Sequence, residues 1–385
     1  MAKLIHFFAT FHTLGGVESI LAHHHRLDRA CRLDSVVACA FNKGMNGNSE
    51  VACLGLTGFS TIVGLRRRFS ELIRRHRPET VIYHNLWGCH SLCDLDGASR
   101  RIGFIHTDSA PMRHVLARDA LLLDGIIAVS KPIADFAATV WPHPDRIRQI
   151  AYPVACPAEL SSHPAWHEPF RLGYCGRLLI EQKRVDRLPA VRQRLCAAFP
   201  NAQLEILGEG DEEKNLRALW HAEKNVVFHG RQAGDIYWQT LSSWDAIVFT
   251  SDYEGTPISL LEAMSVGVLP VYPDTGSGGD DHVRKLSPSL LYRHDDADSL
   301  PAVFQWLKLR SAGEIASLRQ KARDLVAAHT LENYFRQFDS HLAAFKAAPS
   351  MGHPLEAAIS PLMARTPFFL WHRLPWFKKS SAVMP

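Results

Sequence analysis

Short apolar runs rich in β-branched residues alternate along most of the chain with longer stretches whose apolar residues recur every three or four positions. The first pattern predicts buried strands, and the second predicts amphipathic helices. In the first half of the chain, the predicted strands cover residues 3–9, 35–41, 80–85, 101–107 and 125–130. Helical patterns lie between them, for example at 17–28 and 66–76. This alternation is typical of a parallel sheet with helices on both faces.

The alternation stops between Ile150 and Phe170, where proline and histidine are frequent and neither period is present. Such a stretch is typical of an interdomain linker. The pattern then restarts, with predicted strands at 171–178, 202–210, 225–230, 245–251 and 267–273, and helical patterns at 297–310, 313–329 and 331–348. We therefore predict an α/β protein with two doubly wound Rossmann-like domains, at residues 1–155 and 156–345, and a C-terminal tail at 346–385.

The bulk composition agrees with two globular domains. The chain has 385 residues, which is more than one ordinary core needs, and its 46% hydrophobic and 21% charged content is that of a soluble protein. No run of 18 apolar residues is present, so no transmembrane helix is expected. The short apolar run at the N-terminus lacks the features of a signal peptide. The predicted localisation is therefore cytoplasmic.

Metal binding is not expected. The eight cysteines are irregularly spaced and are interpreted as reduced thiols. One stretch does gather His84, Cys89, His90 and Cys93, so a zinc site there stays an alternative, but its spacing is not that of a zinc motif and no second half follows. The acidic stretch at 94–96 does not follow a clear apolar strand and is interpreted as a turn. We predict neither a metal site nor a cofactor.

Two glutamates flank a Gly-Thr-Pro turn after the predicted strand at 245–251. Thr256 suits an N-cap and Pro257 the first helical position, so a helix should begin here and present free N–H groups to an anion. Glu254 precedes this helix start. Glu262 lies about 80° around the helix and roughly 12 Å along it, too far for an acid–base dyad. The pair suits opposite ends of one long, hydroxyl-rich, phosphate-bearing ligand, such as a nucleotide sugar.

Other candidate groups lie at the ends of predicted strands. Arg177 and Lys183 follow the first strand of the second domain, where two cations could neutralise a diphosphate leaving group. Gly15 and Gly16 follow the first strand of the chain and allow close approach of backbone N–H groups to a ligand. His106 ends another strand of the first domain. Each feature alone has an ordinary alternative: a solvated charge, a tight turn or a structural histidine.

Taken together, these motifs resemble retaining glycosyltransferases of the GT-B fold, in particular glycosyltransferase family four. The resemblance rests on stretches that cover the second domain and only the start of the first: Gly15–Glu18, Arg177–Lys183, Leu204–Glu212, Val226–Gly230 and Glu254–Gly267. It implies two domains that face each other across a cleft. The sequence departs from the pattern at Arg184, where glycine is usual, and at the residue after His106, where threonine precedes the aspartate.

The resemblance also implies residue roles. The catalytic group would be His106, Arg177, Lys183 and Glu254, with His106 near the reacting sugar, both cations on the diphosphate and Glu254 on the donor sugar. Glu262 would hold the ribose. The other donor-binding residues would be Gly15, Gly16, Gly208, Gly210, Gly230, Gly255, Thr256, Pro257, Ile258 and Ser259. In this family the nucleoside diphosphate departs without a tightly held metal, and the acceptor attacks the same face of the sugar.

The acceptor side is basic. Residues 1–155 hold 18 Lys and Arg against 13 Asp and Glu, and the predicted helix at 66–76 places arginines outside its apolar face. Residues 357–385 contain no acid and an aromatic cluster. These features suit a lipid-linked or lipopolysaccharide acceptor and peripheral attachment to an anionic membrane; the alternative is a tail packed across the two domains. No nucleic-acid motif is present. Alternative functions are an epimerase or phosphorylase of the same fold, or a nucleotide-sugar-binding protein without catalysis.

Overall fold

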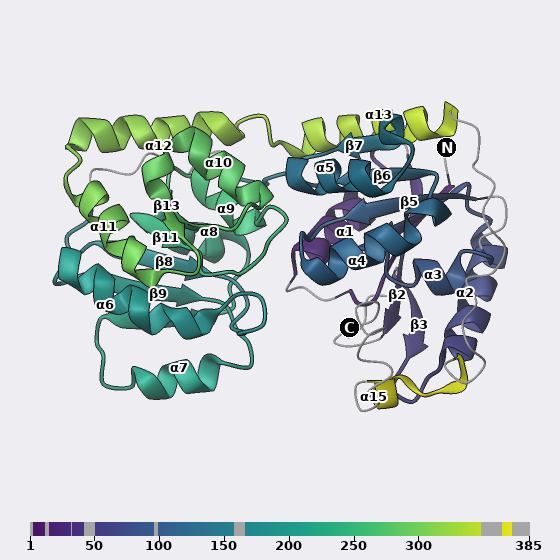
Figure 1. The fold of residues 1–385 in the computed structure, drawn as a ribbon, viewed down its shortest axis with the longest axis horizontal. Coiled ribbons are helices and arrows are strands. Elements are labelled where there is room, and N and C mark those ends of the chain that lie inside the picture. The colour runs from purple at the N-terminus through teal and green to yellow at the C-terminus, as the bar shows by residue number, and fades with distance from the viewer. Residues whose placement is uncertain are drawn as a thin grey trace. The chain divides into compact units, whose positions relative to one another are not determined.

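The computed structural model describes residues 3–11, 15–31, 33–41, 51–95, 99–157, 166–347 and 364–371. The chain forms two compact units (Figure 1). Unit 1 comprises Met1–Ile150 and Phe335–Pro385, and unit 2 comprises Ala151–Tyr334. The first division lies close to the predicted boundary at residue 155. The chain returns to unit 1 at Phe335, so most of the last long helix belongs to unit 1. The sequence predicts instead that residues up to 345 belong to the second domain.

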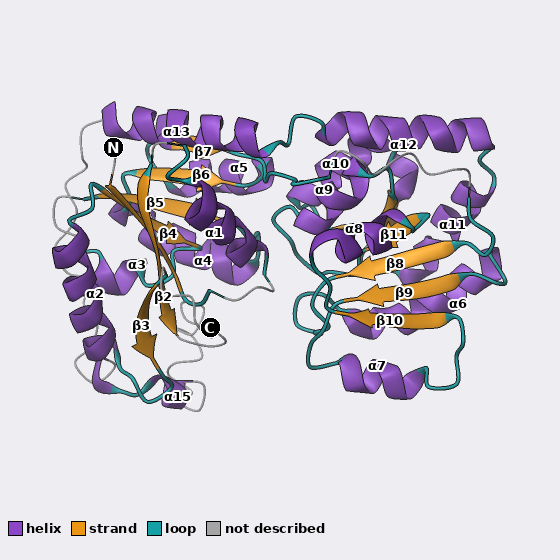
Figure 2. Ribbon diagram, turned by 180° about the vertical axis from the view of Figure 1, so that it is seen from behind, coloured by secondary structure: helices purple, strands orange, loops and turns teal. Residues whose placement is uncertain are grey.

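In the described part of unit 1, seven parallel strands form one sheet in the order β3-β2-β1-β4-β5-β6-β7. The strands are β1 (Lys3–Phe8), β2 (Asp34–Phe41), β3 (Ala52–Leu56), β4 (Thr80–His84), β5 (Arg100–Ile105), β6 (Gly125–Ala128) and β7 (Ile147–Gln149). Every residue of β4 and β6 is buried. Helices cover both faces of a sheet of this kind, which is why its central strands are apolar almost throughout (Figure 2).

The helices of unit 1 follow its strands in the βα order that the hydrophobic pattern predicts. They are α1 (Gly16–Leu27), α2 (Ile62–His76), α3 (Cys89–Leu92), α4 (Ala110–Asp119), α5 (Lys131–Val140), α13 (Leu331–Ala347), α15 (Phe368–Trp371) and the 3-10 turns η1 (Ala120–Leu122) and η2 (Pro144–Arg146). In α2, the Thr61 hydroxyl caps the first turn, and Leu65, Phe69 and Leu72 are buried as predicted.

In unit 2, six described strands form a parallel sheet in the order β10-β9-β8-β11-β12-β13. They are β8 (Arg171–Cys175), β9 (Gln203–Leu207), β10 (Val226–Gly230), β11 (Ala246–Val248), β12 (Leu269–Asp274) and β13 (Leu291–Arg293). The helices are α6 (Leu188–Ala198), α7 (Glu213–Leu219), α8 (Gly234–Ser242), α9 (Ile258–Ser265), α10 (Gly278–Leu286), α11 (Leu300–Lys308) and α12 (Ala312–Val326), with η3 (Val185–Arg187), η4 (Pro288–Leu290) and η5 (Ala297–Ser299). The prediction of two doubly wound α/β domains is confirmed.

Helix α13 packs on unit 1 through aromatic side chains. The Phe338 ring lies 4.5 Å from the His24 ring of α1, and Phe345 packs over Gly125 at the start of β6. Arg100 of β5 donates a hydrogen bond to the Lys346 carbonyl at 3.0 Å. These contacts explain why the end of the chain belongs to unit 1. The periodicity of the sequence shows that the helix is amphipathic, but not which domain its apolar side contacts.

Candidate functional site

The sheet of unit 2 changes its winding direction at β8, which has β9 on one side and β11 on the other. Because all strands are parallel, the loops that follow β8 and β11 leave the sheet at the same edge. Open α/β sheets bind ligands at such a switch point, beyond the carboxyl ends of the strands. The loop after β8 carries Arg177 and Lys183, and the loop after β11 carries Glu254. The structure therefore brings these three predicted residues to one edge.

Lys183 and Glu254 form an ion pair across this edge. The Lys183 Nζ lies 2.5 Å from the Glu254 Oε1, and their side chains are only 15% and 7% exposed. The Ser251 hydroxyl donates to the same oxygen at 2.7 Å, and Gln182 Nε2 donates to Oε2 at 3.3 Å. Both oxygens of the carboxylate therefore have donors. An ammonium group has three N–H donors, so Lys183 can turn toward an added anion.

Arg177 is exposed and reaches the same network through Gln182. Its Nη2 donates to Gln182 Oε1 at 3.0 Å. Gln182 thus connects the Arg177 guanidinium to the Glu254 carboxylate, and its amide also donates to the Tyr253 carbonyl at 3.3 Å. An exposed guanidinium next to a partly buried ammonium is an arrangement suited to a diphosphate, because arginine binds two oxygens at once and lysine acts as a point charge.

Arg184 occupies the position where the sequence departs from the family pattern. Its backbone is left-handed, with φ 48° and ψ 47°, so this position adopts a conformation that favours glycine. The Arg184 guanidinium contacts Asp186 and Asp252, each at 2.9 Å. The hydrogen bond with Asp186 and then that with Asp252 raise the pKa of Arg184. These two ion pairs hold the loop in place despite the backbone strain.

Helix α9 begins one residue later than predicted. Pro257, not Thr256, is the N-cap: its backbone is extended at φ −60° and ψ 128°, and its side chain has no acceptor that could cap the helix. Gly255 and Thr256 lie before the helix, and Ile258 and Ser259 form its first turn. The first N–H groups of a helix have no partner within it, and they carry its positive dipole end. The predicted anion position is therefore kept at this helix start.

Glu262 lies just over one turn into α9 with its carboxylate partly buried. The Tyr237 hydroxyl, from α8, donates a hydrogen bond to Glu262 Oε2. Burial raises the pKa of Glu262 to about 7, although the Tyr237 hydrogen bond opposes this shift. Glu262 and Glu254 therefore have different environments: Glu254 is paired with a cation, and Glu262 is bonded to a neutral hydroxyl.

Backbone contacts join the loops after β8, β9 and β10. Gly208 has φ +144°, and a Cβ there would lie 1.9 Å from the Gly176 carbonyl oxygen; a Cβ on Gly210 would lie 2.4 Å from the Leu178 carbonyl oxygen. The Gly208 N–H donates to the Gly230 carbonyl at 2.8 Å. Gly208 and Gly210 are thus needed for the close packing of these loops. Contact between them and a donor stays a prediction.

Gly15, Gly16 and His106 belong to unit 1. Gly15 is the N-cap of α1 and Gly16 its first residue. The Glu18 side chain folds back over Gly15 and accepts a hydrogen bond from Thr10 at 3.1 Å, so a carboxylate lies at this helix start. His106 is only 4% exposed. Burial, followed by the charges of nearby histidines, lowers the pKa of His106 to about 3.

His106 is not isolated. Its Nε2 lies 2.7 Å from the Nδ1 of His84, at the end of the neighbouring strand β4, and its backbone N–H donates to Asn85 Oδ1 at 2.7 Å. The predicted role of His106 at a reacting sugar stays a prediction. Its partner His84 was missed as a neighbour of His106, although both end predicted strands.

The alternative zinc site near Cys89 has a different explanation in the structure. His84 pairs with His106, and His90 Nδ1 pairs with Asp119 Oδ1 at 3.0 Å. Among the described residues, Cys89 and Cys93 are not part of a group of three potential metal donors. Asp94 forms an ion pair with Arg66 at 2.5 Å, and residues 96–98 lie outside the described part of the chain.

Three functional neighbours were not found from the sequence: Gln182, Ser251 and Tyr237. Gln182 and Ser251 lie within three residues of predicted site residues, so the loops were right although these partners were not named. Tyr237 comes from a helix 25 residues before Glu262, and no motif in the sequence connects the two.

Comparison with known proteins finds similarity to most of unit 2. Residues 159–324 match the family described as glycosyl transferases group 1. Lipopolysaccharide 1,6-galactosyltransferase of Salmonella typhimurium is 31% identical over 138 residues, which are 34% of this chain and 38% of that protein. A GDP-mannose-dependent phosphatidylinositol monomannoside mannosyltransferase of Corynebacterium glutamicum is 33% identical over 134 residues, 33% of this chain and 35% of that protein. The chain thus aligns with little more than a third of either relative.

Solved structures extend the likeness to both units. An apo lipopolysaccharide outer core galactosyltransferase superposes with a TM-score of 0.64 at 20% identity, covering 89% of this chain and 99% of the other. Anabaena HepE in complex with UDP-glucose superposes with a TM-score of 0.69 at 14% identity, covering 89% of this chain and 100% of HepE. At these identities the likeness concerns the fold. Residues 159–324 thus match the glycosyl transferases group 1 family, and the two Rossmann-like units together have the GT-B fold.

Proposed function

We propose that this protein transfers a sugar from a nucleotide-sugar donor, with retention of configuration and without a reacting metal ion, to a glycan or lipid-linked acceptor in lipopolysaccharide or glycolipid synthesis. The observation that carries the proposal is the cluster of Arg177, Lys183 and Glu254 at the switch point of unit 2. It combines two cations for a diphosphate with a carboxylate for sugar hydroxyls.

The chemistry follows from these groups. As the bond between the sugar and the diphosphate breaks, negative charge develops on the diphosphate. The Lys183 ammonium, the Arg177 guanidinium and the N-terminal dipole of α9 stabilise that charge. Glu254 holds sugar hydroxyls, and Glu262 accepts hydrogen bonds from the ribose. The acceptor hydroxyl attacks the face from which the leaving group departs, and its proton passes to the departing diphosphate.

The names of the relatives support the choice of substrates. The Salmonella relative is named for lipopolysaccharide and galactose, and the Corynebacterium relative for GDP-mannose and a phosphatidylinositol mannoside. We therefore include UDP- and GDP-sugars as donors, and lipopolysaccharide core and phosphatidylinositol mannoside as acceptors. An epimerase would convert the donor without an acceptor, and a phosphorylase would require phosphate.

The test is release of nucleoside diphosphate from UDP-galactose, UDP-glucose and GDP-mannose, with and without each acceptor and with EDTA. We expect release that depends on the acceptor and resists EDTA, and an anomeric proton coupling in the product that matches the donor. Arg177→Ala and Lys183→Ala should each reduce the rate by about 100-fold or more, the loss typical of an electrostatic group in a transition state. Arg217→Ala is the matched control, because Arg217 pairs with Glu213 on the surface of α7.

Near wild-type rates in both Arg177 and Lys183 variants would refute the assignment of this loop. Donor conversion that does not depend on any acceptor would favour the epimerase. An inverted anomeric centre would refute retention.

Attachment to an anionic membrane is a second part of the proposal, and it rests on unit 1. The described part of the tail packs on the turn before α2: Phe368 N–H donates to the Ser60 carbonyl at 2.9 Å, and Phe369 N–H to the Gly58 carbonyl at 2.8 Å. This places Phe369 5.0 Å from Phe59, and both rings are exposed. Exposed arginines of α2 supply positive charge nearby in the chain. Within the described residues, no helix is long and apolar enough to cross a bilayer.

The experiment is sedimentation with vesicles of anionic or neutral lipid. We expect anionic vesicles to bind the protein more strongly, high salt to weaken binding, and Phe59→Ser with Phe369→Ser to reduce it. Leu219→Ser removes an equally exposed apolar side chain from unit 2 and should have no effect. Equal binding of wild type and the double variant would refute this part of the proposal.

A further inference from the structure

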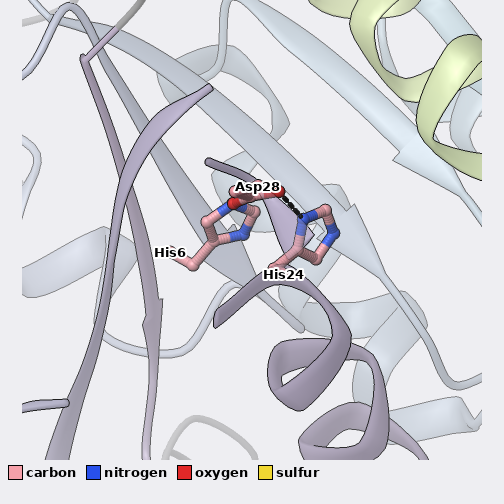
Figure 3. Close-up of side chains that lie close together, drawn as sticks. All are labelled: His6, His24 and Asp28. Atoms are coloured by element: carbon pink, nitrogen blue, oxygen red, sulfur yellow. Dashed lines mark hydrogen bonds and ion pairs between the residues drawn. The ribbon is translucent and has the colours of Figure 1, made fainter. Parts of the chain in front are cut away.

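A cluster of polar side chains lies buried in the core of unit 1. His6 comes from β1, His24 from the last turn of α1, and Asp28 from the residue that follows this helix. Their exposed fractions are 0%, 0% and 1%. The three side chains converge on one another (Figure 3). Within the described part of the chain, this is the group in which three potential metal donors lie within 4.8 Å of one another.

Hydrogen bonding leaves part of the cluster unsatisfied. His24 Nδ1 and Asp28 Oδ1 are 2.9 Å apart and form a good hydrogen bond. His6 Nε2 and Asp28 Oδ2 face each other at 3.4 Å without one, and neither atom has another hydrogen-bond partner in the described residues. A buried polar atom without a partner destabilises a fold. Two such atoms that face each other therefore indicate a ligand between them.

The burial of the cluster points in the same direction. Asp28 is 1% exposed, and a buried carboxylate is unfavourable without a full counter-charge, which a cation would supply.

We propose that His6, His24 and Asp28 bind one divalent transition-metal ion of the zinc class. Two imidazoles and a carboxylate without thiolates form a donor set that such ions accept. Two ligands of a tetrahedral zinc ion, with bonds of about 2.0–2.2 Å, lie roughly 3.4 Å apart, and this is the separation of His6 Nε2 and Asp28 Oδ2. His24 supplies the third donor by moving its ring proton from Nδ1 to Nε2.

A second shell of histidines supports the site. His6 Nδ1 lies 3.0 Å from His84 Nε2, and His84 Nδ1 lies 2.7 Å from His106 Nε2. A metal-bound imidazole donates its other N–H to an outer partner. With the ion on His6 Nε2, His6 donates to His84, His84 donates to His106, and His106 carries its ring proton on Nδ1. Without the ion, Asp28 favours a proton on His6 Nε2, and the chain of donors runs in the opposite direction.

The site is closed by α13. The Phe338 ring lies 4.5 Å from His24 and 5.8 Å from His6, and the Phe335 ring lies 5.3 Å from His24. An ion enclosed in this way has a structural role, and it is taken up while unit 1 folds or when α13 opens. The metal should therefore be supplied during expression, and exchange should be slow.

The experiment uses the full chain, without a histidine tag, expressed with zinc or with cobalt and kept reduced. We expect about one equivalent of bound metal that resists brief EDTA treatment. The cobalt protein should show visible ligand-field bands but no thiolate-to-cobalt charge-transfer band, which separates this site from the eight cysteines. Asp28→Asn and His24→Gln should lose this equivalent. His90→Gln should keep it, because His90 also pairs with a buried aspartate, Asp119, but outside this group.

Wild-type protein that holds no stoichiometric metal under these conditions overturns the proposal, as does equal metal content in wild type, Asp28→Asn and His24→Gln. If a variant does not fold, the cobalt spectrum of the wild type still decides, because a spectrum with thiolate bands places the ion elsewhere. None of these outcomes tests the cluster of Arg177, Lys183 and Glu254 in unit 2, on which the proposed transfer rests.

Discussion

Replacing Glu254 by glutamine should strengthen binding of a free nucleoside diphosphate while it slows sugar transfer. In the structure, the predicted diphosphate ligand Lys183 and the predicted sugar ligand Glu254 contact each other at 2.5 Å. A diphosphate that approaches Lys183 must therefore compete with the Glu254 carboxylate. Glutamine has a similar shape and keeps hydrogen-bonding capacity for Ser251 and Gln182, but it removes the competing charge.

The size of the effect follows from the strength of the contact. A hydrogen bond between charged groups contributes about 1.5–3 kcal/mol. If Lys183 gives up roughly half of this when it turns to the diphosphate, the variant gains about 0.8–1.5 kcal/mol of binding free energy. Because 1.4 kcal/mol changes a dissociation constant about tenfold, the nucleoside diphosphate should bind about four to twelve times more tightly. Transfer should slow, since an amide holds sugar hydroxyls less well than a carboxylate.

Isothermal titration calorimetry with UDP and GDP measures the affinity, and the transfer assay measures the rate. Asp186→Asn is the matched control: it removes one negative charge from the same loop, but Asp186 contacts Arg184 and not Lys183. Exposed charges are screened by salt, so this control should change the affinity by less than about twofold. Unchanged or weaker binding in Glu254→Gln, or equal strengthening in Asp186→Asn, would refute the competition between Glu254 and the diphosphate.

Three further predictions concern unit 2. Arg184→Gly should be more stable than Arg184→Ala by about 1 kcal/mol and should therefore melt at a higher temperature. Both variants lose the ion pairs, but only glycine relieves the strain of the left-handed backbone. Equal melting temperatures would contradict this. The folded pKa of Glu262, about 7, is raised above its ordinary 4.5, so its contribution to stability is full below pH 4.5 and is lost as the pH rises to 7. Relative to Glu262→Gln, the free energy of unfolding of the wild type should therefore fall across this range, with a slope of at most about 1.4 kcal/mol per pH unit, and its melting temperature should fall with it. Melting temperatures of the two proteins that change in parallel with pH would contradict the shift. Gly208→Ala should lower the free energy of unfolding by about 2–3 kcal/mol, because its Cβ would meet the Gly176 carbonyl. Gly230→Ala should lower it by only about 1 kcal/mol, because the space around Gly230 is open. Urea unfolding of both variants measures the difference.

The periodicity of the sequence predicted most of the fold, because central parallel strands are buried on both faces and lie in mostly apolar stretches of the sequence. The predicted strand at 80–85 is observed at Thr80–His84, and the one at 171–178 forms its first five residues. The edge strands β3, β7 and β13 were missed. β7 and β13 have three residues each, which is too short for a period to appear, and their exposed positions carry polar side chains.

The candidate site was predictable as loops but not as pairs of atoms. Motifs located the segments around Lys183 and Glu254, since each follows a strand end. Whether two side chains from such loops contact a ligand or each other depends on rotamers that no motif encodes. Tyr237 shows the limit most clearly, because its contact with Glu262 depends on how α8 packs against α9.

The histidines of unit 1 illustrate a different limit. His6, His84 and His106 each lie in or next to a predicted strand, and each alone resembles an ordinary structural histidine. Their contact follows from the strand order, in which β4 lies between β1 and β5. Strands β1 and β4 are not consecutive in the sequence, so the sequence order does not place these side chains together. Only the doubly wound order makes them neighbours.

The charges at the unit 2 site explain why the proposed mechanism requires Lys183 to exchange its partner Glu254 for the diphosphate. Lys183 is paired with Glu254, and burial raises the pKa of Glu262, so the exposed Arg177 supplies most of the free positive charge. In the proposed mechanism, a diphosphate is therefore attracted first through Arg177 and the N-terminus of α9. Lys183 then leaves Glu254 for the diphosphate, and this movement frees the carboxylate to accept hydrogen bonds from the sugar. On this proposal, binding of the diphosphate and preparation of the sugar site are one event, and disruption of the pair should uncouple nucleotide affinity from transfer.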